Sequence, residues 1–199
     1  MMQFRPLLWP TFFALPALLV LVWLGTWQLQ RLEWKNQLIA DFESRATAAP
    51  IDLPRGDVGP EMEFRRLALT GRFDHTKEVF MTGRTYEGNA GFHIVTPFTL
   101  KDGRTVLVNR GWVSESYRDQ SKREFTLAAG EVTLAAILRF PGKKGYFVPE
   151  NEPENGFWFT LVPEQIVRHL GLEGQAESDI YAATIRTSET IELPIAART

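Results

Sequence analysis

The sequence predicts an α+β fold, mainly antiparallel β, that is barrel- or sandwich-like and carries one short helix, tethered by an N-terminal transmembrane helix. Two patterns lead to this fold class. The first is a long uncharged apolar run near the N-terminus, which is typical of a membrane span. The second begins near residue 63, where apolar and polar residues alternate in short segments, as they do in strands with one buried face.

The apolar run covers 25 uncharged residues, 6–30, of which 17 are Ala, Val, Leu, Phe or Trp. A hydrocarbon core about 30 Å thick requires about 20 helical residues, so the run is long enough to cross it. A cleaved signal peptide is the alternative, but its apolar region would span only about 7–15 residues and end at small residues. The segment Gly25-Thr26-Trp27-Gln28 does not fit such a cleavage site. We therefore predict that residues 1–30 are an uncleaved anchor in a lipid bilayer.

Residues 31–60 are predicted to form a juxtamembrane helix and then a linker rich in proline and glycine. Over 31–46, the side chains that recur near the helical period are Leu32, Lys35, Ile39 and Phe42. Prolines and glycines between residues 50 and 60 interrupt regular structure and mark the linker. The soluble, mainly β domain is then expected over 61–199.

About seven strands are expected in this domain, at 64–73, 78–85, 92–100, 104–113, 131–140, 156–162 and 180–186. The third and fourth form a hairpin, because Asp102-Gly103 favours the primed turns that join antiparallel strands. One helix begins at Pro163, since proline suits a first helical turn. Its core-facing side chains are expected to be Ile166, Val167 and Leu170, with Gly171 as the cap.

The composition excludes several classes of protein. Lys and Arg number 22 against 24 Asp and Glu, giving a net charge of −2, so a nucleic-acid binder with a basic face is not expected. The chain has no cysteine. That excludes disulfide scaffolds, thiolate zinc or copper sites and haem attachment through a C-x-x-C-H motif.

Catalytic and metal-binding motifs are sparse. Glu150, Glu152 and Glu154 cluster in a proline-rich loop, and they are the basis of one alternative, a tethered envelope hydrolase that would need two carboxylates with separated pKa values. A solvated loop is the plainer interpretation. The histidines lack carboxylates at ligand spacing, and no G-x-S-x-G nucleophile motif is present. No catalytic residues and no metal ligands are predicted, and the pattern favours a tethered binding module over an enzyme.

Two groups of residues carry both a structural and a functional interpretation. Trp27, Arg31 and Trp34 share one helical face; they are interfacial anchors, or they dock on a partner. Arg110 lies in an otherwise apolar strand, so if it is buried it needs a carboxylate or carbonyl partner. Its neighbours Gly111 and Trp112 are interpreted as a strand bulge and a core residue, or as part of a binding surface.

Four blocks in order resemble a known family. They are GTWQLQR (25–31) with Trp34-Lys35; GRFDH (71–75) through Lys77-Glu78 to Gly83-Arg84-Thr85; Thr96-Pro97-Phe98 with VLVNRGWV (106–113); and FVPEN (147–151) with Pro153, Trp158 and IYAA (180–183). Together these blocks, which cover residues 25 to about 185, resemble the surfeit locus protein 1 family, the membrane-anchored assembly factors of haem–copper cytochrome c oxidase.

The resemblance implies a non-enzymatic factor in a bacterial inner membrane, with its β domain facing the periplasm, although the flanking charges do not decide the orientation. It would assist haem a insertion or maturation of the oxidase large subunit. Its expected partners are that subunit, other assembly factors and the lipid bilayer. The partner-binding residues that the resemblance and the patterns above favour are Trp27, Arg31, Trp34, Asn109, Arg110, Gly111, Trp112, Pro149, Asn151 and Pro153. A plain structural binding module remains a further alternative.

Members of this family generally have a second membrane helix, whose histidine is the suggested haem a ligand and would lie beyond Thr199. That position makes the present sequence either a truncated form or a member that lacks the helix. His75 and His93 are weak candidates within the chain. Haem a is therefore expected to be bound transiently at most, with none held stably by these residues.

Overall fold

The computed structural model describes residues 8–185. The chain divides into two compact units between Ser44 and Arg45. The helices are α1 Leu8–Thr47 and α2 Pro163–His169, and the 3-10 helices are η1 Pro60–Met62, η2 His75–Lys77, η3 Glu115–Tyr117, η4 Gln120–Thr126 and η5 Pro153–Asn155. The strands are β1 Arg66–Phe73, β2 Val79–Tyr86, β3 Asn89–Leu100, β4 Thr105–Ser114, β5 Val132–Arg139 and β6 Tyr181–Thr184.

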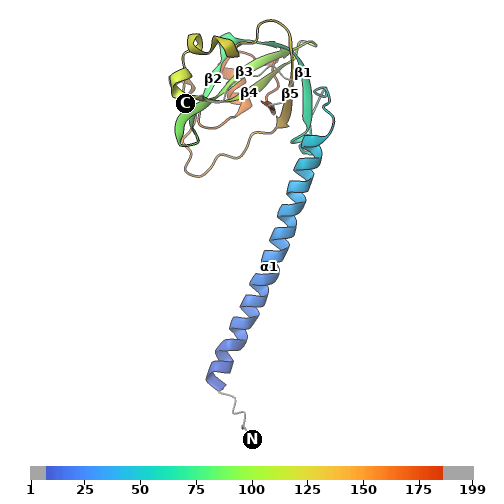
Figure 1. The fold of residues 1–199 in the computed structure, drawn as a ribbon, viewed down its shortest axis with the longest axis vertical. Helices are drawn as coiled ribbons and strands as arrows, with labels where there is room; N and C mark the ends of the chain where they lie inside the picture. The colour runs from blue at the N-terminus through green and yellow to red at the C-terminus, as the bar shows by residue number, and fades with distance from the viewer. Residues whose placement is uncertain (1–7, 186–199) are drawn as a thin grey trace. The chain divides into compact units, whose positions relative to one another are not determined.

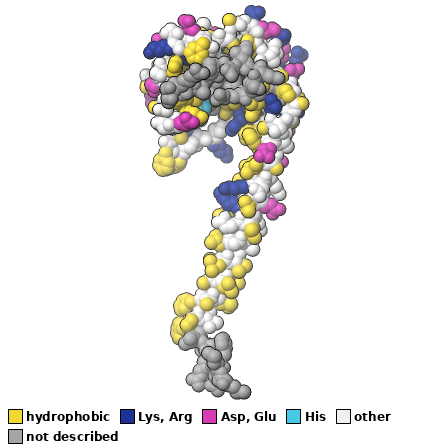
Figure 2. Space-filling view, in the orientation of Figure 1, with side chains coloured by type: hydrophobic (Ala, Val, Ile, Leu, Met, Phe, Trp, Pro, Cys, Tyr) yellow, Lys and Arg dark blue, Asp and Glu magenta, His cyan; other side chains and the backbone are white. Residues whose placement is uncertain are grey.

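Helix α1 has 40 residues and is therefore about 60 Å long, about twice the thickness of a hydrocarbon core. It is long and apolar enough to cross a membrane, with a mean hydropathy of 1.8 in its most apolar window. Figure 2 shows apolar side chains along its N-terminal part and charged side chains on its C-terminal part. The helix predicted over 31–46 is the continuation of this element.

The six strands form one sheet in the order β1-β5-β6-β4-β3-β2, and Figure 1 shows β1 to β5 gathered together. All pairings are antiparallel except the one between β4 and β6. The sheet curves enough for β1 to pair with β3 as well as with β5. Gly71 permits this second pairing, since a Cβ there would lie 2.0 Å from the carbonyl oxygen of Thr99.

Two larger clusters of buried side chains, and a small one of Phe92, Ile94 and Val113, hold the sheet. The larger lies on one face, where β1 and β5 contribute alternate residues such as Leu67, Leu69 and Leu134. The second lies on the other face, where Ile166 and Val167 of α2 pack with Trp158. Strand β4 serves both clusters, since Val106 and Val108 belong to the first and Leu107 to the second. Burial of Ile166 and Val167 confirms the core face predicted for this helix.

The prediction of seven strands is wrong in one segment. Residues 156–162 form only isolated bridges, at Trp158 with Met81 and at Phe157 with Glu152. The backbone of this segment takes a side-chain partner instead of a strand: Asn151 Oδ1 accepts from the N–H groups of Phe159 and Thr160 at 2.8 and 2.9 Å. The other six predicted segments overlap β1 to β6, but β2 extends to Tyr86, β3 begins at Asn89 and β4 extends to Ser114. Arg186, at the end of the last predicted segment, lies outside the described residues.

Candidate functional site

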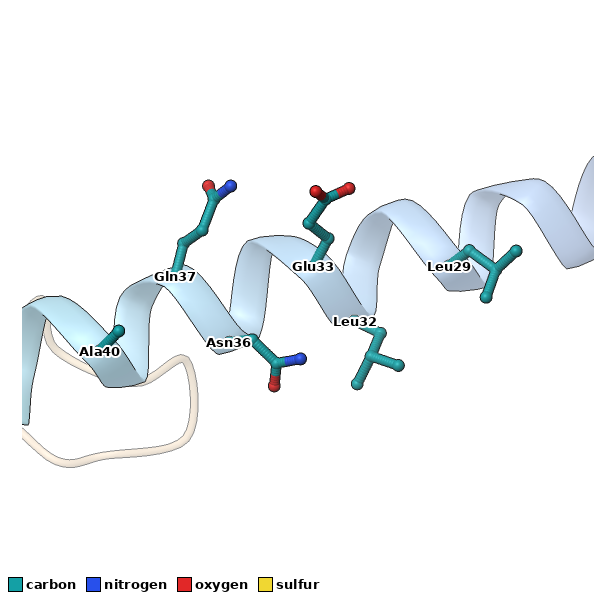
Figure 3. A pocket seen from close by; sticks show the side chains of 6 residues that line it. All are labelled: Leu29, Leu32, Glu33, Asn36, Gln37 and Ala40. Carbon is teal, nitrogen blue, oxygen red and sulfur yellow. The ribbon is translucent and has the colours of Figure 1, made fainter.

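The candidate residues on α1 lie where the helix leaves its uncharged run. Arg31 lies over the indole of Trp27, with its guanidinium carbon 5.6 Å from the ring centroid. Trp27 and Trp34 are 42% and 57% exposed. Around the helix, a shallow hollow is lined by Leu29, Leu32, Glu33, Asn36, Gln37 and Ala40 (Figure 3). The exposure of the two indoles makes the face that carries Trp27, Arg31 and Trp34 available to lipid or to a partner helix, whereas the hollow lies on the Leu29 side of the helix.

The Asn109-Arg110-Gly111-Trp112 block forms a β-bulge in β4. Val95 of β3 pairs with Asn109 and Ile94 pairs with Gly111, so Arg110 is the extra residue. Gly111 has φ of 104°, a conformation that favours glycine. Asn109 Oδ1 accepts from the N–H of Gly111 at 3.0 Å and shapes the bulge. The bulge frees Arg110 from the alternation of the strand.

Arg110 enters a buried charged cluster that we define as Glu78, Arg110, Arg123 and His75. Arg110 Nη1 donates to Glu78 Oε1 at 2.6 Å, and Arg123 Nη2 donates to Glu78 Oε2 at 2.5 Å. The exposed fractions of these side chains are 0% for Arg110, 1% for Arg123 and 5% for Glu78. The partner expected for a buried Arg110 is thus a carboxylate, and Arg110 also donates to the carbonyl of Thr126.

His75 completes the cluster with both ring nitrogens engaged. Nε2 donates to the carbonyl oxygen of Ala128 at 3.2 Å, and Nδ1 lies 3.2 Å from Glu78 Oε1. Arg123 Nε donates to the carbonyl of Tyr117. These contacts reach the segment 115–128, which lies between β4 and β5. The charged cluster therefore holds this segment against the start of β2 and the bulge of β4.

The electrostatics keep Glu78 and Arg110 ionised. Burial alone would raise the pKa of Glu78, but the hydrogen bonds of His75 and Arg123 and the positive charges of Arg123 and Arg110 outweigh burial and hold this pKa below its usual range. Burial lowers the pKa of Arg110 to about 10, while the Glu78 carboxylate opposes that fall. At neutral pH, therefore, one carboxylate lies between two guanidinium groups. Their faces contact the rings of Phe73 and Phe80.

The remaining candidates of β4 pack near His93. Asn109 Nδ2 donates to His93 Nδ1 at 3.1 Å, and Trp112 Nε1 donates to the carbonyl of Arg84 at 3.2 Å. Burial and the charge of Arg84 lower the pKa of His93. Trp112 is 7% exposed, so this indole is a core residue of the domain.

The proline-rich loop is organised by Asn151. Its side chain bonds Phe159 and Thr160 as described above, and Nδ2 also donates to Gln165 Oε1 at 2.7 Å. Pro153 begins η5, and Pro149 is exposed. We call these hydrogen bonds the Asn151 clamp. The clamp joins the loop to the start of α2, a role that the sequence pattern did not indicate.

The three carboxylates of that loop are exposed: Glu150, Glu152 and Glu154. Glu150 pairs with Lys144, and Glu152 accepts from Asn155. They do not share a buried site that would separate their pKa values, so the hydrolase alternative has no support from this geometry. Among residues 8–185, no three His, Cys, Asp or Glu side chains are grouped to hold a metal ion.

The predicted residues therefore fall in three places: one face of α1, the β4 bulge with its buried partners, and the Asn151 loop. The structure brings Asn109 to His93 and Arg110 to His75. Glu78 and Arg123 were missed from the candidates. The available signal was the unsatisfied charge of Arg110, but it did not single out a partner among 24 acidic residues.

Comparison with known proteins gives a consistent match. The model of the SURF1 family matches residues 15–197. Surfeit locus protein 1 of Mus musculus is 40% identical over 166 residues, which are 75% of this chain and 54% of the mouse protein. The Homo sapiens protein of the same name is 38% identical over 167 residues, 75% of this chain and 56% of its own.

A third relative carries a functional name. "Cytochrome oxidase assembly protein SHY1" of Saccharomyces cerevisiae is 36% identical over 155 residues, 73% of this chain and 39% of the yeast protein. The chain spans about half the length of the curated mammalian relatives it matches.

Proposed function

Because the chain belongs to the SURF1 family, we propose that it is a membrane-tethered assembly factor for haem–copper cytochrome c oxidase and acts on the large subunit by binding rather than by catalysis. The observation that carries the proposal is the family match over residues 15–197, which includes α1 from Leu15 onward and every described element of the β domain. The name of the yeast relative supports the assembly role.

The geometry supports a scaffold with two binding regions. In the bilayer, Trp27, Arg31 and Trp34 offer a face on which a membrane helix of the oxidase can pack. Outside the bilayer, the charged cluster holds the segment 115–128 in a fixed position, and the Asn151 clamp holds the proline-rich loop. A rigid binding surface loses less entropy on association than a mobile one.

Haem a fits the described residues poorly. Both ring nitrogens of His75 have protein partners. His93 is half-buried, its Nδ1 accepts from Asn109, and it lies near the charge of Arg84. We therefore propose that these residues hold haem a transiently at most. When the protein is purified from cells that make haem a, we expect no stoichiometric Soret band. A strong band that disappears in His93→Ala or His75→Ala would refute this part.

The proposed location is a bacterial inner membrane, with the β domain in the periplasm. An alkaline phosphatase fused after Asp57 should be active, since this enzyme folds only outside the cytoplasm, and a cytoplasmic reporter at the same place should be silent. The reverse pattern would place the domain in the cytoplasm and contradict the proposal.

The central experiment is complementation. Deletion of the gene should lower oxidase activity and haem a content, and the wild-type chain should restore both. The affinity-tagged protein should co-purify with the large subunit, and Trp27→Ala/Trp34→Ala should reduce this recovery. Leu29→Ala is the matched control, because two residues along a helix turn its side chain to the opposite face. Normal oxidase activity and haem a content after deletion would remove the case for the function.

A further inference from the structure

The loop between β5 and η5 ends in an exposed aromatic tip. Tyr146 and Phe147 are the two central residues of a turn in which Val148 N–H donates to the carbonyl of Gly145 at 3.1 Å. They are 94% and 93% exposed, and their rings meet edge to face with centroids 5.0 Å apart. Phe125, at 62%, is the next most exposed large apolar side chain in the described part of the β domain.

The loop holds this tip away from the core. At its N-terminal end, the loop leaves β5 after Arg139. At its C-terminal end, Asn151 Nδ2 donates to the carbonyl of Thr160 and to Gln165 Oε1. Pro141 and Pro149 restrict the backbone on both sides of the turn. The two rings are therefore displayed by a turn with fixed ends, in a domain whose buried apolar residues form three clusters.

Two lysines lie on the N-terminal side of the tip, and glutamates follow it from Glu150 onward. Residues 140–149 include Lys143 and Lys144 and no acidic side chain. Lys144 pairs with Glu150 at the edge of this segment. Aromatic rings next to lysines are typical of segments at the membrane–water interface, where the rings enter the headgroup layer and the ammonium groups meet lipid phosphates.

The small area of the tip also favours a bilayer over a protein as its partner. Two aromatic side chains bury about 300–500 Å² in all, whereas each side of a stable protein interface buries about 800 Å². A bilayer needs no such extended patch. If α1 spans the membrane, as the proposed function requires, the β domain is tethered to a bilayer.

We propose that the Gly145–Val148 turn is a second membrane contact, which inserts Tyr146 and Phe147 into the headgroup layer of an anionic bilayer. This inference rests on the tethering in the proposed function. The contact would restrict the orientation of the β domain relative to the membrane and so limit which parts of the oxidase subunit it can meet.

The absence of cysteine from these 199 residues allows a direct test in this chain. Gly142→Cys provides a single label site in the loop, where an added Cβ meets no atom within 4 Å. The full-length chain, labelled there with an environment-sensitive fluorophore, is placed in phosphatidylethanolamine–phosphatidylglycerol vesicles with nitroxide-labelled headgroups. We expect strong quenching by the nitroxide lipid. Tyr146→Ser/Phe147→Ser should reduce the membrane-contacting population roughly tenfold or more, and Phe125→Ser is the matched control that should leave it unchanged.

Three results would overturn the inference. The parent protein could show no quenching, the Tyr146→Ser/Phe147→Ser variant could be quenched equally, or the fluorophore could report an apolar environment only after oxidase subunits are added. The last would assign the tip to a protein partner. Flotation of the vesicles distinguishes failure of the proposed tether from failure of the second membrane contact. Protein that does not float contradicts the tether and the proposed function, whereas protein that floats without quenching contradicts only the second contact.

Discussion

Replacing Glu78 by glutamine removes the single carboxylate that lies between Arg110 and Arg123. Both guanidinium groups are essentially inaccessible, at 0% and 1% exposure of the side chain, so they would stay buried without a compensating charge. Breaking a buried ion pair from one side costs about 3–5 kcal/mol. For a domain of this size, that loss lowers the midpoint of thermal unfolding by about 10–20 °C. Far-UV circular dichroism of the full-length protein in detergent would measure the midpoint.

The control is an ion pair of the same type on the surface. Lys101 and Glu131 lie 2.9 Å apart, with side chains 62% and 46% exposed, and such pairs contribute at most about 1 kcal/mol. Glu131→Gln should therefore shift the midpoint by no more than about 4 °C. If Glu78→Gln costs no more than Glu131→Gln, the reasoning from burial is refuted.

The same variant has a pH signature. The pKa of Glu78 is lowered in the folded state, below the ordinary glutamate value of 4.5, so the folded protein binds this proton less readily than the unfolded chain. The stability from the carboxylate is then present above the unfolded pKa and is lost as the pH falls through the folded pKa. Wild-type protein should lose stability below about pH 4.5, and the Glu78→Gln variant should lack this component.

Three further changes test other parts of the domain. Gly111→Ala forces a Cβ into a backbone with φ of 104° and should cost about 1–2 kcal/mol; an unchanged unfolding midpoint would contradict the strain. Asn151→Ala removes the acceptor of two backbone N–H groups and should cost about 1–3 kcal/mol, with faster proteolysis over 140–160, whereas wild-type cleavage rates would show that the clamp is dispensable. Burial and the charge of Arg84 lower the pKa of His93, so the stability that this group contributes should be lost as the pH falls below about 6.5. In His93→Gln, the unfolding midpoint should depend less on pH in that range. An equal dependence in both proteins would exclude a contribution of His93.

Local patterns predicted most of the strands because each buries one face or both. β1 and β5 alternate buried and accessible residues. The β3–β4 hairpin forms as predicted, but its turn is not a primed one, because Gly103 has a positive φ and Asp102 does not. The pattern failed over 156–162, where Trp158 and Leu161 are buried as in a strand. The side chain of Asn151 satisfies the backbone there, and alternation alone does not reveal which hydrogen-bond partner a segment uses.

Long-range partners were less accessible from the sequence. Arg110 in an apolar strand indicated that a buried countercharge was required, but Glu78 lies 32 residues away and its selection depends on the bulge at Gly111. The parallel pairing of β6 with β4 is of the same kind. β6 has four residues, too few for periodicity to define either its direction or its neighbours.

The position of β6 has a consequence for biosynthesis. β6 separates β4 from β5 in the sheet, yet 66 residues, 115–180, lie between the end of β4 at Ser114 and the start of β6 at Tyr181. At ~5–20 residues per second, a ribosome needs roughly 3–13 s to supply that stretch. During this interval one edge of β4 is a free template for incorrect strand pairing. The nascent domain is therefore most exposed to aggregation and to quality-control proteases late in translation, long after α1 has emerged.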